Sequence, residues 1–246
     1  MEESDNDWRM QDIFFLAEDW TSPWTGKTNK KGSQVTLVST TQLTKKKQLT
    51  IAIPNATAIC ISASRRIWKE ALEIRSTSKI DRSSKSKVTF NSKSEAFDYI
   101  ERIMESIIMA YTALEAFVNE KIPDDFNYEH TNRKNDTTEV MDKQSIERRF
   151  SLNEKLSNIL PLTIDIQSPK GSKCWHSYRK LEKIRNRIIH MKKEDRRPTG
   201  PEIPTLWHEL FKVEPPYVQA KEMIDYFVNN MQSQPRWHNE YSKRSI

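Results

Sequence analysis

The stretch Arg185-Asn186-Arg187-Ile188-Ile189-His190 ends the most clearly patterned segment of this 246-residue chain. If Ser172 is the N-cap of a helix that runs to about Lys192, the apolar residues share one stripe at about 100° per residue. That stripe contains Trp175, Tyr178, Leu181, Ile188 and Ile189. Arg185 lies near its centre. Because a guanidinium cannot lose its proton, we expect this arginine to meet an anion or to face a solvated cleft.

A second helix is predicted over residues 94–121. Ser92 and Glu95 have the spacing of a capping box, and Pro123 ends the pattern. Apolar residues recur there every three or four positions, which predicts one long buried face. The predicted face consists of Phe97, Ile100, Met104, Ile107, Ile108, Tyr111, Leu114 and Val118.

Each predicted helix carries one charge within its apolar stripe. Glu115 lies in the middle of the stripe of the helix predicted over residues 94–121, with Asn119 four residues further on at the edge of that stripe. We therefore predict that the two helices pack together with Glu115 close to Arg185. Glu182 is an alternative, local partner for the arginine. A purely structural ion pair, with His190 as an ordinary surface histidine, is the competing interpretation.

Three ordered segments resemble a known family. They are Tyr111–Glu120 (YTALEAFVNE), Ser151–Leu156 (SLNEKL), and Trp175 followed by the Arg185–His190 motif. Together they are similar to HEPN (higher eukaryotes and prokaryotes nucleotide-binding) domains over roughly residues 92–232. The motif alone does not identify the family, because roughly one arginine followed by a histidine at this spacing is expected by chance in a chain of this length and composition.

The resemblance implies a bundle of four or five helices that dimerises and brings two copies of the motif into one cleft. Many such domains are metal-independent endoribonucleases of toxin–antitoxin, abortive-infection and antiviral systems. By position, Arg185 and His190 match the ends of the motif, and Asn186 matches the polar residue that often follows the arginine. Glu115 matches an acidic residue that supports the site in some members. These four residues are the predicted catalytic set.

The chemistry of RNA cleavage suits these residue types. The 2′-hydroxyl is the nucleophile, so an enzyme has to deprotonate it, stabilise the phosphorane and protonate the leaving 5′-oxygen. Histidine, with an ordinary pKa of about 6.5, suits the proton transfers, and arginine offers a fork of donors to phosphate. The expected products are a 2′,3′-cyclic phosphate and a 5′-hydroxyl, with no metal and no cofactor. The residues predicted to bind RNA are Arg187, Asn119, Lys192 and Lys193.

The spacing of the motif favours a site shared between two copies. Residues five apart on a helix point about 140° away from each other, so Arg185 and His190 of one copy grip a phosphate poorly. A composite site across a two-fold axis would repair this.

Charge divides the chain unevenly. The formal net charge is +6, but residues 1–20 hold seven acidic residues and one basic residue, so the remainder carries +12. A basic body suits a polyanionic partner such as RNA, and the acidic head could cover it as an internal mimic of RNA. We predict three parts: an acidic head with a small β-rich region (residues 1–91), the helical bundle (92–232) and a basic tail (233–246).

The predicted fold class is α+β, mainly α, with a small N-terminal antiparallel β element. The predicted strands are Gln34–Thr40 and Gln48–Ile53, which flank a Lys45–Lys47 turn, together with Ala58–Ala63 and Lys87–Phe90. Residues 67–74 are ambiguous between helix and strand, and residues 75–87 read as an exposed loop. Further along the chain we predict a mobile polar loop over Pro123–Gln144, a short helix from Ser151 through Leu160 and a last helix over Tyr217–Met231.

Other classes of protein fit poorly. Cys60 and Cys174 form no paired framework, and the lone Cys174-x-His176 lacks partners at zinc spacing. The N-terminus is unlike a signal peptide, and no apolar run has the length of a membrane span, so we expect a soluble cytoplasmic protein. With 4 glycines in the chain, a glycine-rich phosphate loop is disfavoured.

The function that this sequence predicts best is a HEPN-type endoribonuclease, a homodimeric toxin or antiviral effector held in check by an antitoxin or other regulatory partner. One alternative is a non-catalytic HEPN-like module that binds RNA or a nucleotide. Another is a helical interaction subunit whose motif only packs the dimer.

Overall fold

The computed structural model describes residues 7–23, 26–132 and 137–243. It divides into two compact units. The terminal unit combines Met1–Ile59 with Ser233–Ile246, and the helical unit is Cys60–Gln232. This division differs from the three-part division predicted from the sequence, because residues 60–91 belong to the helical unit.

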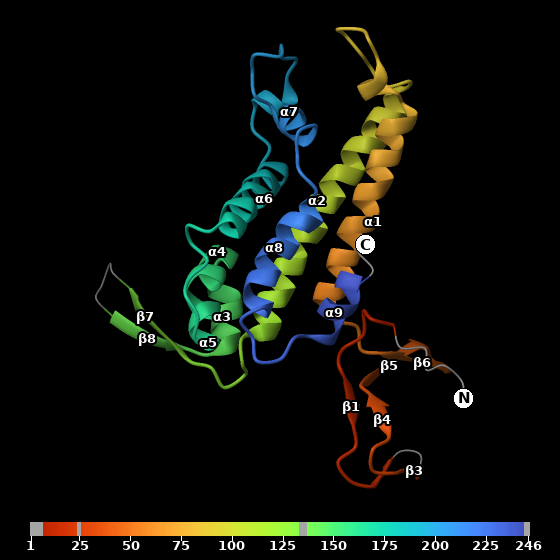
Figure 1. Ribbon diagram of the computed structural model, residues 1–246, viewed down its shortest axis with the longest axis vertical. Coiled ribbons are helices and arrows are strands. Elements are labelled where there is room, and N and C mark those ends of the chain that lie inside the picture. The colour runs from red at the N-terminus through yellow and green to blue at the C-terminus, as the bar shows by residue number, and fades with distance from the viewer. Residues whose placement is uncertain (1–6, 24–25, 133–136, 244–246) are drawn as a thin grey trace. The chain divides into compact units, whose positions relative to one another are not determined.

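The terminal unit contains three small antiparallel strand pairs (Figure 1). They are β1 (Ile13–Phe15) with β4 (Gln34–Thr36), β2 (Trp20–Thr21) with β3 (Thr28–Asn29), and β5 (Val38–Thr44) with β6 (Lys47–Ala52). The hairpin predicted around the Lys45–Lys47 turn is therefore confirmed as β5–β6. Thr40 and Thr50 face each other across this hairpin, with hydroxyl oxygens 2.8 Å apart.

The predicted basic tail is helical over α9 (Arg236–Lys243). Its Tyr241 packs against Trp8, with ring centroids 5.5 Å apart. The head therefore meets the C-terminal segment in the described residues. The acidic residues at positions 2, 3 and 5 lie outside the described part of the chain.

The predicted strand Ala58–Ala63 is wrong, because these residues belong to the long helix α1 (Ala56–Thr77). Asn55 caps the helix by accepting the backbone N–H of Ala58 at 2.9 Å. The buried residues then recur at helical spacing, as Ile61, Ser64, Trp68 and Ala71 do. The ambiguous residues 67–74 are helical for the same reason.

The predicted strand Lys87–Phe90 is also absent, since the structure assigns no strand to these described residues. Phe90 instead packs against Tyr99 and Phe211, with ring centroids 5.5 and 6.0 Å apart. Tertiary packing of the aromatic ring takes the place of a strand. The predicted loop before it contains the end of α1 and a 3-10 turn, η1 (Ile80–Arg82).

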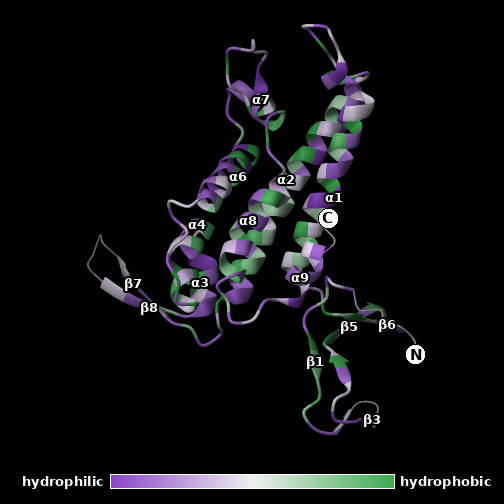
Figure 2. Ribbon diagram, in the orientation of Figure 1, coloured by the Kyte–Doolittle hydropathy of each residue, from purple (hydrophilic) through white to green (hydrophobic). Residues whose placement is uncertain are grey.

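The core of the helical unit is built by α2 (Lys93–Lys121), α6 (Lys173–Ile189) and α8 (Pro216–Val228), which pack against one another. α1 lies antiparallel beside α2, joined through Ser64 and Ser106, whose hydroxyls each donate to the other's carbonyl at 2.8 and 2.9 Å. Figure 2 shows hydrophobic residues distributed along α2, α6 and α8. The fully buried side chains at the centre include Ile107, Leu114, Phe117, Tyr178, Leu181, Ile224 and Phe227.

The helix predicted over residues 94–121 is confirmed, but its buried face is rotated. Phe97 is 67% exposed, while Tyr99, Ile103, Ala110 and Phe117 are buried. Small side chains at Ser106, Ala110 and Ala113 let neighbouring helices approach closely, and this draws the contact face away from Phe97. At its start, Ser92 Oγ accepts the backbone N–H of Glu95 at 3.1 Å.

The mobile loop predicted over Pro123–Gln144 is wrong for the residues that the structure describes, and residues 133–136 lie outside them. The segment forms a hairpin of β7 (Tyr128–Asn132) and β8 (Thr137–Met141), followed by α3 (Lys143–Arg149). Tyr128 and His130 lie edge-on to Phe150, with centroids 5.5 and 5.0 Å away. These aromatic contacts, and the buried side chain of Met141, anchor a hairpin that polar composition alone concealed.

The connecting elements complete the unit. The predicted short helix comprises α4 (Leu152–Glu154), a π-helical segment η2 (Lys155–Ile159) and α5 (Leu160–Thr163), and it begins with the predicted Ser151–Glu154 capping box. After α6 come the 3-10 turn η3 (Glu194–Arg196) and α7 (Leu206–Leu210). α8 confirms the helix predicted over Tyr217–Met231, but it is not the last helix, because α9 follows it. Within the described ranges, no helix has the length and apolar character needed to span a membrane.

Candidate functional site

The helix that carries the motif is fixed at both ends. Gly171, with a φ of 85°, makes the turn before the helix, and Ser172 Oγ accepts the backbone N–H of Trp175 at 3.2 Å. At the other end, the backbone N–H of His190 donates to the carbonyl of Asn186 at 2.9 Å. The predicted N-cap is confirmed, and α6 ends at Ile189 rather than near Lys192.

Arg185 turns inward, as its helical phase predicts. Its Cζ lies 4.5 Å from the centroid of the Tyr111 ring on α2, so the guanidinium stacks on a buried phenol. Its Nη1 donates to Oδ1 of Asn186 at 3.0 Å. The arginine is therefore held by a ring and an amide, and part of its donor fork is left for another acceptor.

The phenols beneath Arg185 belong to a polar cluster. Burial raises the pKa of Tyr111 to about 12, and the carboxylates of Glu182 and Glu115 act in the same direction. Burial also raises the pKa of Tyr178, whose hydroxyl donates to Glu182 at 3.1 Å. Arg179 forms an ion pair with the other oxygen of Glu182. Glu182 is thus held by Tyr178 and Arg179, and not by Arg185.

The predicted pairing of Glu115 with Arg185 is not formed. No hydrogen bond or ion pair joins them in the part of the chain that the structure describes; Oε1 of Glu115 lies 3.8 Å from Nζ of Lys155 instead. The reason is that Glu115 sits at the edge of the buried face, with 41% of its side chain exposed, and reaches the start of η2.

Lys155 is the fully buried ammonium of this cluster. Its Nζ donates to Oδ1 of Asn119 at 3.0 Å and to the carbonyl of Glu147 at 3.1 Å. Burial lowers the pKa of Lys155, and the charge of Glu115 opposes that effect. Asn119, a predicted RNA-binding residue, is therefore engaged inside the protein. Lys155 opens a π-helical segment, a feature often found at functional sites.

His190 lies on the other side of α6. It is exposed and occupies the C-cap position, with φ −118° and ψ 62°. An offset of about 140° between residues five apart explains why it faces solvent while Arg185 faces Tyr111. The two predicted catalytic residues do not meet within one copy of the chain. The imidazole can exchange protons with bulk water or with a molecule bound at this surface.

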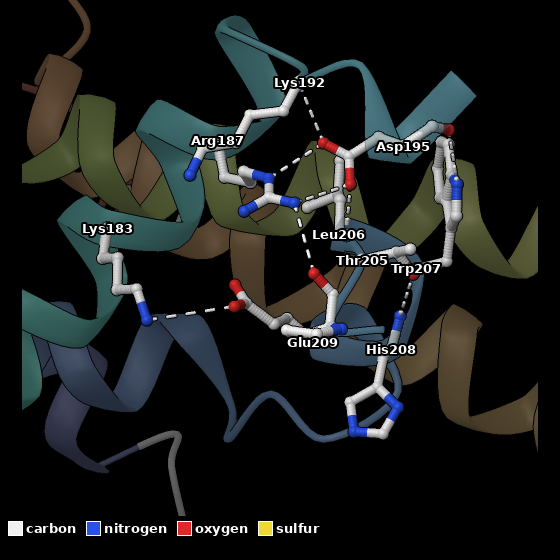
Figure 3. Close-up of polar contacts among 10 residues, drawn as sticks. Lys183, Arg187, Lys192, Asp195, Thr205, Leu206, Trp207, His208 and Glu209 are labelled. Atoms are coloured by element: carbon white, nitrogen blue, oxygen red, sulfur yellow. Dashed lines mark hydrogen bonds and ion pairs between the residues drawn. The ribbon is translucent and has the colours of Figure 1, made fainter. Parts of the chain in front are cut away.

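Arg187 has a structural role that the sequence did not reveal (Figure 3). Its Nε and Nη2 donate to the two carboxylate oxygens of Asp195 at 2.8 and 2.7 Å. The Asp195 side chain is fully buried, and that of Arg187 is 14% exposed. This guanidinium is already occupied, so the predicted contact of Arg187 with RNA would require the ion pair to open.

Asp195 gathers further donors. Its carboxylate accepts the backbone N–H groups of Lys192 and Leu206 at 2.9 and 2.7 Å, and its carbonyl accepts Nε1 of Trp207 at 2.9 Å. The hydrogen bond from Arg187 lowers the pKa of Asp195, and the two backbone donors add to this effect. Sequence reasoning missed Asp195 because a Lys-Lys-Glu-Asp run is typical of an exposed surface.

Lys192 and Lys193 lie in the exposed segment just before Asp195. Both residues are exposed, and the recorded contact of Lys192 with Asp195 is made by its backbone. They follow His190 by two and three residues in the same exposed segment. Of the four predicted RNA-binding residues, these two present their charge to solvent.

A large apolar groove adjoins the end of the motif. It has a volume of about 1180 Å³ and runs between α1, α2 and the end of α6. On α2 it is lined by apolar residues that the core of the helical unit does not cover: Phe97, Ile100, Met104 and Ile108. The floor also includes Ile188, Met191 and Trp207, so the groove reaches the residues on both sides of His190.

No family model matches the chain, and no curated protein or solved structure matches it either.

Proposed function

We propose that this chain is a metal-independent endoribonuclease of the HEPN type that works as a homodimer. One observation carries the proposal. The guanidinium of Arg185 is held against the Tyr111 ring, while His190 is exposed on another side of α6. The two side chains of one copy therefore do not reach the same phosphate. Two copies related by a two-fold axis can enclose one phosphodiester between an arginine of one copy and a histidine of the other.

In the proposed reaction His190 removes the proton from the 2′-hydroxyl, whose oxygen attacks the adjacent phosphorus. Arg185 stabilises the additional negative charge of the phosphorane. The bond from phosphorus to the 5′-oxygen then breaks, and that oxygen takes a proton from a water molecule, to which the protonated His190 returns the proton it removed. Asn186, already bonded to Arg185, holds the guanidinium in place. Glu115 lies too far from the arginine for a direct contact, so we assign it to holding Lys155.

The apolar groove supports self-association. Its α2 rim carries Glu101, Arg102 and Glu105, and its α1 rim carries Arg66 and Glu70. Arg66 pairs with Glu70, and Arg102 with Glu70 and Glu105, so the rims carry no excess of one sign that would repel a second copy under a two-fold rotation. Phe97 adds an exposed ring that a second copy of the groove can cover. We therefore assign the groove to a second copy of the chain.

Cleavage of total RNA in excess chelator tests the proposal. We expect wild type to produce 2′,3′-cyclic phosphate ends, and His190→Ala and Arg185→Ala to lose at least about 100-fold in rate while remaining folded. His208→Ala, which removes an exposed histidine of α7, is the matched control and should retain activity. Absence of cleavage by wild type at every protein concentration favours a non-catalytic RNA-binding module.

Expression in cells tests the proposed role as a toxin or defence effector. Growth should slow when wild type is induced and recover when His190→Ala is induced at the same level. Equal toxicity of both would show that growth arrest does not depend on the imidazole.

A further inference from the structure

The solvent face of α6 carries a row of basic residues that leads to His190. Lys173, His176, Lys180 and Lys183 follow one another at spacings of three, four and three residues, and His190 lies seven residues beyond Lys183. Positions at such spacings share one helix face. From Lys180 to His190 the row covers about 15 Å, the length of about four stacked nucleotides.

Two hollows follow this row. One of about 260 Å³ is lined by Lys180, Lys183 and Lys212, and one of about 360 Å³ by Lys173, His176 and Lys180. Both share Lys180, Glu214 and Gln219, so they adjoin each other between α6 and the segment that leads into α8. Their linings also include Glu209 and Glu222. We call the two hollows together the lysine groove.

The lysines of this groove are loosely engaged. Lys180 lies 3.6 Å from Glu214, and Lys183 lies 3.9 Å from Glu209, with side chains that are 67% and 78% exposed. Lys173 lies 3.4 Å from Glu222. Exposed pairs at these distances contribute little free energy, so a phosphate can replace the carboxylates. The ammonium groups are therefore available, in contrast to the guanidinium of Arg187 on the same face.

Gln219 gives the groove a second, independent feature. The residue is buried, and its Nε2 donates to Glu214 at 3.4 Å. Its Oε1 is buried and accepts no hydrogen bond from the described residues. A buried acceptor without a donor is unfavourable, so an N–H group that enters the groove would be bound. The edge of a nucleobase supplies such a group.

We propose that the lysine groove holds a single strand of RNA, with phosphates on Lys173, Lys180, Lys183 and Lys212 and a base edge at Gln219, and directs it toward His190. The choice of RNA rests on the proposed function. The charge of α6 and the turn after it supports this choice, since residues 173–197 contain ten Lys or Arg and three Asp or Glu. The groove itself is lined by four lysines and by Glu209, Glu214 and Glu222, which a phosphate would have to displace from the lysines. A groove along one helix fits one backbone, which favours a single strand over a duplex.

Binding of an oligonucleotide that cannot be cleaved tests the groove separately from catalysis. The probe is a fluorescein-labelled, 2′-O-methylated 12-mer, whose nucleophile is blocked, and fluorescence anisotropy gives Kd at several salt concentrations. The double variant Lys180→Glu with Lys183→Glu should bind at least about tenfold more weakly. The slope of log Kd against log salt should fall by about 1.4, at about 0.7 for each lost phosphate contact.

The matched control is Lys69→Glu with Lys93→Glu, which reverses two exposed charges outside the groove and should change Kd less than about twofold. Gln219→Leu should weaken binding without changing the salt slope, because it removes a hydrogen bond and no charge. Melting temperatures establish that every variant is folded.

Three outcomes would overturn the inference. They are equal binding by the groove and control variants, no binding of the probe by wild type, and equally effective competition by polyglutamate, which would assign the groove to acidic peptides. Wild type that binds through the groove but cleaves no RNA would refute the proposed nuclease and leave the groove intact. If wild type cleaves RNA and the Lys180→Glu/Lys183→Glu variant binds the probe as tightly as wild type, the nuclease proposal stands and the lysine groove is refuted.

Discussion

The guanidinium of Arg187 and the carboxylate of Asp195 form a two-point ion pair, with N–O distances of 2.8 and 2.7 Å. The pair joins α6 to the turn that follows it, and the backbone N–H of Leu206 brings in the start of α7. One buried carboxylate therefore connects three segments that are separated in the chain.

Removal of this carboxylate should destabilise the helical unit. Asp195→Ala leaves a largely buried guanidinium and two backbone donors without their acceptor, and we expect the free energy of unfolding to fall by about 3 kcal/mol. Urea denaturation measures it. Glu194→Ala, which removes the exposed acid next to it, should change the value by less than about 0.5 kcal/mol. Equal values for the two variants would contradict the clamp.

The same pair predicts an acid-dependent loss of stability. Since the pKa of Asp195 is lower in the folded chain than in the unfolded chain, its contribution is present above about pH 4 and is lost as the pH falls toward the folded pKa. The difference in unfolding free energy between wild type and Asp195→Asn should be constant from about pH 7 to 5 and shrink below about pH 4. A difference that stays constant down to pH 3 would show that Asp195 is not held as an anion.

Lys155 predicts a second rise in stability, at alkaline pH. Burial lowers its pKa in the folded chain, so the unfolded chain binds more protons between the folded value and about 10.4. Stability should therefore rise with pH in that range for wild type relative to Lys155→Met. Lys121→Met, whose lysine forms an ion pair with Glu120, serves as the control. Parallel profiles for wild type and Lys155→Met would contradict the burial of the ammonium.

A shared active site predicts complementation. Arg185→Ala and His190→Ala should each be inactive, but mixing them in equal amounts should restore about one quarter of wild-type activity. Half of the dimers are then mixed, and each mixed dimer has one of its two composite sites intact. Analysis of RNA ends after subunit exchange measures this. No recovery despite demonstrated exchange would place both residues in one copy.

The apolar groove predicts how the dimer is disrupted. Phe97→Glu with Met104→Glu puts charges into the groove and should raise the dimer dissociation constant at least about tenfold. Val140→Glu alters another exposed apolar residue, on β8, and should leave it unchanged. Light scattering across a concentration series measures both. Wild type that is monomeric throughout would contradict the assignment of the groove to a second copy.

Local sequence signals predicted much of the fold. The caps at Ser92, Ser151 and Ser172 are confirmed, because a cap depends on contacts three residues away. The hairpin at β5–β6 is confirmed for a similar reason. The strand predicted at Ala58–Ala63 failed, since a short apolar run has no period of its own until longer-range packing extends it into a helix.

The candidate site was harder to predict. Helical phase gave the inward direction of Arg185 correctly but not its contact, because phase says which face is buried and not what covers it. Tyr111 covers Arg185, and Glu115 turns to Lys155. The buried positions of Lys155 and Asp195 depend on segments far away in the sequence, and charged residues carry no periodic signal of burial.

The anchoring of the backbone around His190 has a consequence for the proposed catalysis. Its own N–H is bonded to Asn186, and two residues later the N–H of Lys192 is bonded to Asp195. Because the backbone is hydrogen-bonded on both sides of His190, the imidazole ring changes its position mainly by rotation about its two side-chain bonds. The backbone around His190 is therefore ordered when the protein folds, and the binding of an RNA strand does not have to order it before the proposed proton transfer.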